Sequence, residues 1–141
     1  MQGILVLYYL VALTAALILL NAYKRNTIIG VKIGKVMLAT FLLVVFYSFN
    51  IIGTSFLVKS VALSLYFITM DVIMLLFYDY ILEFIGWREK IPRGVFYCIF
   101  TGAVVDMVFM LLNPYNEIAL GYEMTAYGED FVLTYIIKLP F

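Results

Sequence analysis

Four long apolar runs follow one another along this chain, and short segments holding half of the charged residues separate them. Each run supplies roughly 20 apolar residues, the length that a helix needs to cross about 30 Å of hydrocarbon. Because an open strand cannot satisfy its backbone groups in lipid, helix is the expected conformation. The pattern predicts an all-α integral membrane protein with four transmembrane helices, over residues 3–23, 36–58, 60–84 and 94–112.

Basic residues are concentrated in two of the connecting segments, and this asymmetry predicts how the chain is threaded. The connection between the second and third runs holds only Lys59, in a tight turn. Cytoplasmic segments of membrane proteins collect Lys and Arg. We therefore expect the N-terminus outside, the two basic segments inside and the tail from Asn113 outside. The basic residues of those two segments are Lys24, Arg25, Lys32, Lys35, Arg88, Lys90 and Arg93.

The tail has a different pattern from the four runs. Residues 118–137 alternate between apolar and polar positions in two halves, and residues 127–130 between them have turn chemistry. This predicts a β-hairpin within an extracellular loop over residues 113–141. An isolated hairpin is only marginally stable in water, so we expect it to pack on the helix ends. The chain stops directly after the second strand, and we expect it to be a fragment whose further spans follow.

The composition narrows the classes of function. The chain is 66% hydrophobic and 13% charged with no net charge, whereas a soluble domain is about 25% charged. Balanced charge gives no signal for nucleic acid. Without histidine, and with the single cysteine Cys98 in the fourth run, neither a Cys/His metal set nor a His-activated nucleophile can form. We expect no enzyme activity, metal or cofactor in this segment, and a multi-pass location in the lipid bilayer of the cell membrane.

Two acidic residues lie deep inside the predicted spans. Asp71 is near the middle of the third run, and Asp106 follows Arg93 by 13 positions, roughly 20 Å at 1.5 Å per residue. The two should therefore lie at similar depth on antiparallel neighbouring helices. We do not expect the two acids to be ionised at the same time, unless a ligand, a missing helix or a second subunit supplies a cation. Either they form a polar pocket for a cationic or protonatable ligand, with Asn50 in hydrogen-bonding reach, or they fix the helix register.

A second acidic pair, Asp79 and Glu83, lies toward the predicted cytoplasmic end of the third run. A spacing of four residues places both on one helix face, within reach of Arg88, Lys90 or Arg93. The pattern is typical of an interfacial ion cluster, because charges are common at the ends of membrane helices. A proton path is the other interpretation.

Residues 57–87, with the sequence LVKSVALSLYFITMDVIMLLFYDYILEFIGW, resemble the N-terminal seven-span membrane region of some bacterial histidine kinases and diguanylate cyclases. The resemblance is carried by Lys59 in the outer turn, Tyr66 early in the next helix and the aromatic-rich close at residues 77–86. A second match is the Leu-Asn-Pro-Tyr-Asn run at residues 112–116, which is similar to an Asn-Pro turn at the family's outer face.

The resemblance implies a membrane sensor region that controls a cytoplasmic kinase or GGDEF output domain absent from this chain. On this hypothesis Asp71, Asp106 and Asn50 line the pocket of an unknown small ligand, and Tyr115 and Glu117 lie near its mouth. We expect a homodimer. The alternatives are a small proton-coupled transporter, in which the acids would carry the proton, and an oligomeric membrane subunit without a ligand. The scarcity of proline within the runs favours the sensor, because transporter helices are often broken.

Overall fold

The computed structural model describes residues 2–25, 27–117, 120–127 and 130–137. It contains four helices followed by two strands. By length and composition α2, α3 and α4 can each cross a membrane, and α1 holds a shorter apolar stretch, Val6–Ala22. Helix is therefore confirmed for all four predicted runs, whereas the crossing by α1 stays a prediction. The elements are α1 (Gln2–Arg25), α2 (Ile28–Ile52), α3 (Phe56–Phe84), α4 (Arg93–Asn116), β1 (Leu120–Tyr127) and β2 (Asp130–Ile137).

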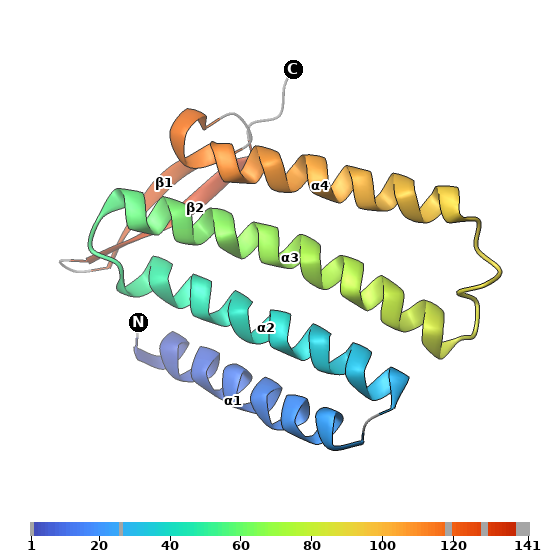
Figure 1. Ribbon diagram of the computed structural model, residues 1–141. Coiled ribbons are helices and arrows are strands. Elements are labelled where there is room, and N and C mark those ends of the chain that lie inside the picture. The colour runs from blue at the N-terminus through green and yellow to red at the C-terminus, as the bar shows by residue number, and fades with distance from the viewer. Residues whose placement is uncertain (1, 26, 118–119, 128–129, 138–141) are drawn as a thin grey trace.

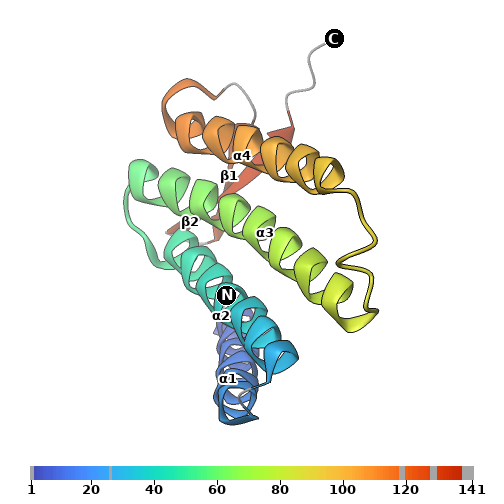
Figure 2. The same cartoon turned by 45° about the vertical axis from the view of Figure 1, so that its right-hand side comes forward.

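The helices lie side by side in chain order and alternate in direction (Figure 1). The principal contacts join α1 to α2, α2 to α3, and α3 to α4, so the helices form an open layer and not a closed bundle (Figure 2). One end of the layer carries the strands and the start of α1, and we call it the hairpin end. The other carries the α1–α2 connection and the α3–α4 loop, and we call it the basic end.

Small residues bring α1 close to α2. Ala12, Ala15 and Ala22 of α1 are buried, and a Cβ on Gly30 would lie 3.0 Å from the carbonyl oxygen of Ala22. Close backbone approach through small residues is the usual way in which membrane helices pack. The N-cap of α2 is Thr27, whose hydroxyl accepts a 3.0 Å hydrogen bond from the Gly30 amide.

The α2–α3 connection differs from the prediction. The second span was expected to run to residue 58 with Lys59 in the turn, but α2 ends at Ile52 and Lys59 lies in the first turn of α3. The turn residues decide this boundary: the Gly53 amide donates to the Phe49 carbonyl at 2.8 Å, and the Ser55 hydroxyl caps α3. The prediction was wrong because it placed the boundary at the charge and not at the turn chemistry.

Lys59 instead joins the two helices as a buried cation. Its side chain is 1% exposed, and its ammonium donates to the carbonyl oxygens of Asn50 at 2.9 Å and Ile51 at 3.5 Å. The last carbonyls of a helix have no intrahelical donor and carry the negative end of the helix dipole. Lys59 therefore satisfies the end of α2 from the start of α3.

The two strands pair antiparallel, with Leu120 opposite Ile137 and Tyr127 opposite Asp130. Strand β2 contacts α2 and α3. The Tyr122 ring meets the Phe56 ring edge-on at 5.7 Å, and its hydroxyl accepts a 2.8 Å hydrogen bond from the buried Asn113 amide of α4. The hairpin thereby touches three helices, and its extracellular side stays a prediction.

The Asn-Pro turn expected at residues 112–116 is absent, because Pro114 lies inside α4. Proline removes one backbone donor, and membrane helices tolerate that loss where neighbours satisfy the freed groups. The helix ends two residues later at Asn116. Its C-cap Glu117 adopts a left-handed conformation (φ 48°) and donates its amide to the Asn113 carbonyl at 2.9 Å.

The α2–α3 turn generates a stability prediction. A Cβ at Gly53 would lie 2.7 Å from the Phe49 carbonyl oxygen, so Gly53→Ala should lower the free energy of unfolding by about 1–3 kcal/mol, as overpacking does elsewhere. Gly102→Ala is the matched control, because a Cβ there meets nothing within 4 Å. Unfolding both variants in mixed detergent micelles measures the difference. Equal stability of the two variants would contradict the tight turn.

Candidate functional site

Asp71 and Asp106 are brought together by the packing of α3 on α4. Asp71 lies in the middle of α3 and is partly buried, whereas Asp106 of α4 remains exposed on the surface of the helix layer. Their carboxyl groups lie close enough to interact. The prediction that these two acids lie at similar depth on neighbouring helices therefore agrees with the geometry.

The environment of this pair limits its charge. Asp71 Oδ2 is enclosed and has no hydrogen-bond donor among the described residues. Two ionised carboxylates only accept hydrogen bonds, so a donor arises between them only when one of them is protonated. The pair can therefore hold one proton in a shared hydrogen bond, or two negative charges beside a cation that comes from outside these residues.

The remaining residues of the predicted pocket lie elsewhere. Asn50 is at the end of α2, where its carbonyl accepts from Lys59. Lys59 precedes Asp71 by 12 residues on α3, roughly 18 Å along a helix. Tyr115 is 80% exposed, and Glu117 closes α4 at the hairpin end. The structure thus brings together Asp71 and Asp106 and separates them from Asn50, Tyr115 and Glu117, whose ligand role stays a prediction.

Three tyrosines from three helices form a cluster that the sequence analysis did not identify. The Tyr8 and Tyr47 rings are 4.9 Å apart, and the Tyr47 and Tyr66 rings are 5.3 Å apart. The only signal in the sequence is that each tyrosine lies inside an apolar run, where a hydroxyl needs a protein partner. The cluster ties α1, α2 and α3 together.

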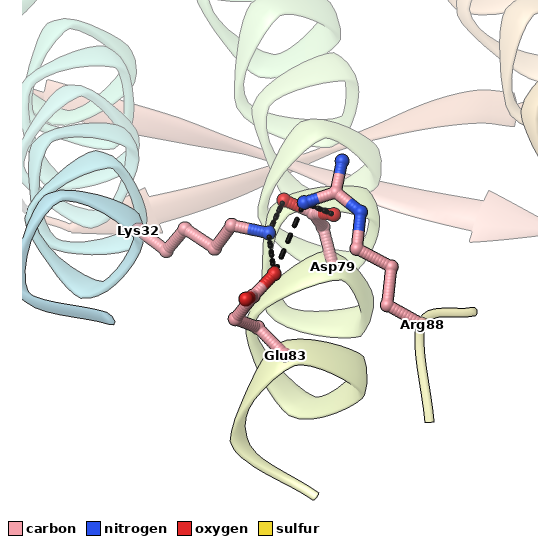
Figure 3. Close-up of polar contacts among 4 residues, drawn as sticks. All are labelled: Lys32, Asp79, Glu83 and Arg88. Atoms are coloured by element: carbon pink, nitrogen blue, oxygen red, sulfur yellow. Dashed lines mark hydrogen bonds and ion pairs between the residues drawn. The ribbon is translucent and has the colours of Figure 1, made fainter. Parts of the chain in front are cut away.

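An ion network joins α2 and α3 near the basic end (Figure 3). The Lys32 ammonium lies 2.9 Å from both Asp79 Oδ2 and Glu83 Oε2. The Arg88 guanidinium lies 3.1 Å from Glu83 Oε2 and 3.6 Å from Asp79 Oδ1. The hydrogen bond that Arg88 donates to Glu83 and the negative charge of Asp79 raise the pKa of Arg88 above its usual value, so Arg88 is permanently charged.

This network confirms one predicted partner and adds another. Arg88 was one of the three basic residues expected to reach the acidic pair. Lys32 was assigned to a loop, but α2 begins at Ile28 and carries Lys32 in its second turn. Its side chain is 11% exposed, against 57% for Arg88. Lys32 is therefore the more enclosed cation, and it was missed because only the helix pairing reveals which face it occupies.

Comparison with known proteins identifies no relative. No protein family matches the chain, and neither a curated protein nor a solved structure matches it. The functional argument therefore depends on the geometry of these clusters and on the membrane character of α2, α3 and α4.

The ion network makes Lys32 a stabilising residue. Lys32→Met should lower the midpoint of thermal unfolding in detergent by several degrees, because it leaves Asp79 and Glu83 side by side with only the exposed Arg88. Lys35→Met is the control, since Lys35 is exposed on the same helix. Arg88→Met should have a smaller effect than Lys32→Met, because exposed ion pairs contribute little. The reverse order would contradict the assignment of Lys32 as the principal partner.

Proposed function

We propose that this chain is the membrane-embedded input region of a bacterial signal-transduction protein, and that it controls a cytoplasmic kinase or diguanylate cyclase output domain absent from this chain. The observation that supports the proposal is the Asp71–Asp106 pair at the α3–α4 contact. In this hypothesis the pair senses a proton or a small cationic ligand, and α4 transmits the result.

The uneven packing of the helices supports this role for α4. Seven residues are buried in α2 and seven in α3, but in α4 only Met110 and Asn113 are buried among the described residues. Helices α2 and α3 are also joined by Lys59 at one end and by the Lys32 network at the other. Helix α4 is therefore the one least constrained by its neighbours, and a change at Asp106 acts on the helix most able to move.

The pair has two protonation states, and these provide the two states that a sensor needs. With one proton, the two carboxyl groups share a hydrogen bond and hold α4 against α3. Without that proton, like charges repel in a medium of low dielectric constant. A ligand shifts the balance only if it binds one of these states better than the other. A proton does so directly, and an organic cation does so by neutralising the ionised pair.

The hairpin end offers a second input to the same helix. Asn113 of α4 donates to Tyr122, whose strand belongs to the hairpin that also contacts α2 and α3. We propose the topology with the N-terminus and this hairpin outside and the basic end in the cytoplasm, in the plasma membrane. A change at the outer face would then reach α4 through Asn113. Asp106, exposed on the layer, is suited to contact further helices or a second copy in a homodimer.

A small proton-coupled transporter or an oligomeric membrane subunit is the second candidate, and the same pair of protonatable acids favours it. Many transporters place their sites at broken helices, whereas α2, α3 and α4 are continuous over their described lengths. This continuity favours the input region.

The proposal predicts a movement of α4 that depends on pH. Spin labels on native Cys98, exposed on α4, and on Leu20→Cys of α1, 63% exposed, report the distance across the layer. Raising the pH through the titration of the pair should change this distance by roughly 1–2 Å, the size of common helix shifts. Asp71→Asn with Asp106→Asn should abolish the change, because neither side chain can then ionise.

Glu89→Gln is the control, since Glu89 is an exposed carboxylate outside the pair. A distance that does not respond to pH, or that responds equally in the double variant, would overturn the proposal. Proton flux into liposomes carrying the purified chain separates the two candidates: a flux lost in Asp71→Asn would favour the transporter.

A further inference from the structure

A cavity of about 650 Å³ lies where α3 ends and α4 begins, beside the Lys32 network. Its lining has a cationic part and an apolar part. Arg88 and Arg93 supply the cationic part, and Leu82, Ile91, Phe96 and Tyr97 supply the apolar part. The cavity is therefore charged on one side and apolar on the other, at the end of two membrane helices.

Two acidic residues, Asp79 and Glu89, also line the cavity. Asp79 is paired with Lys32 and Arg88, and Arg88 is also paired with Glu83, so the charges of Asp79 and Arg88 are compensated within the protein. Among the described residues no ion pair engages Arg93, the first residue of α4. The whole basic end has an excess of positive charge, because Lys24, Arg25, Lys32, Lys35, Arg88, Lys90 and Arg93 face only Asp79, Glu83 and Glu89.

The apolar part of the lining continues along α4. Phe96 is 40% exposed and stacks on Phe100, 46% exposed, with ring centroids 6.3 Å apart. Tyr97 beside them is 63% exposed. These rings lie one to two helical turns after the start of α4, at the level where the headgroups of a bilayer meet its acyl chains. A molecule that fills the cavity and continues along the rings has an anionic head and a long apolar tail.

We propose that this cavity binds an anionic phospholipid, with Arg93 on the phosphate and an acyl chain along Phe96 and Phe100. Arginine suits this role because its planar donors match phosphate oxygens, and basic recesses between membrane helices bind anionic headgroups. The lipid would connect the α3–α4 loop to the start of α4. This inference does not depend on the sensor proposal, because the site requires only that the basic end lies at a bilayer surface.

The chain carries its own reporter for this site. Trp87 is the only tryptophan of the protein and lies directly before Arg88. Brominated acyl chains quench tryptophan on contact, so Trp87 reports which lipid lies beside the loop. The full chain is placed in phosphatidylcholine bilayers with increasing fractions of brominated phosphatidylglycerol, and in a second series the bromine is on the phosphatidylcholine.

Brominated phosphatidylglycerol should quench Trp87 preferentially, and Arg93→Gln should reduce its relative association constant roughly fivefold, because it removes the guanidinium that meets the phosphate. Lys24→Gln is the matched control, because it removes the same charge from the basic end on α1, away from the cavity. That variant should keep the preference for phosphatidylglycerol.

Three results would overturn the proposal. The first is equal quenching by the two lipids in the wild-type chain. The second is an equal loss of preference in Lys24→Gln and Arg93→Gln, which would indicate general surface charge and no site. The third is loss of the preference on addition of inorganic phosphate but not of chloride at the same ionic strength, which would assign the cavity to a soluble phosphate compound.

Discussion

A polar group inside hydrocarbon has no water with which to form hydrogen bonds. The polar contacts of this protein follow from that constraint. Helix formation satisfies the backbone within each run, but it leaves the ends of helices and the polar side chains to find partners. At the α2–α3 turn the partner is Lys59, whose ammonium reaches the carbonyls that α2 leaves open. Such a lysine is enclosed at 1% exposure because the carbonyl dipoles replace the water that it has lost.

Helix α3 carries polar contacts to its two neighbours at three positions along its length. Lys59 joins it to α2 at the hairpin end, and the Asp79–Glu83 pair joins it to Lys32 near the basic end. Between them, Asp71 faces the opposite neighbour, α4. The two contacts toward α2 place a cation on an anion or on carbonyl dipoles. The contact toward α4 joins two acids. In the proposed function they attract each other when they share a proton and repel each other when both are ionised.

In the proposed function, this asymmetry divides the layer into a fixed part and a responsive part. Helices α1, α2 and α3 share the tyrosine cluster, the close approach of α1 to Gly30 and the two polar contacts of α3. Helix α4 is held by the acid pair, by Asn113 at the hairpin end and by its apolar contact with α3. The proposed lipid would add a contact at its other end. A proton at mid-depth and a phosphate at the bilayer surface would then act on the same helix from two positions.

The sequence by itself determined the features that depend on local pattern. Run length and hydropathy predicted four helices, alternation and turn residues predicted the strands, and counting along the runs placed Asp71 and Asp106 at one depth. These properties follow from helical rise and from the cost of exposing backbone to lipid, and both act within one segment. Where local chemistry was given too little weight, as at Gly53 and Ser55, the boundary was wrong by several residues.

Only the tertiary structure decided which faces meet. Lys32 reaches Asp79 and Glu83, Lys59 turns back to Asn50, and Tyr8, Tyr47 and Tyr66 converge, although nothing in the spacing of these residues specifies their partners. The separation of Asn50 from the acid pair and the open layer of helices are of the same kind. The physical reason is that a lipid-facing and a protein-facing surface are equally apolar in a membrane helix, so hydrophobicity marks no interior face. Contacts between small residues and between polar groups select the neighbours, and these exist only once the helices are packed.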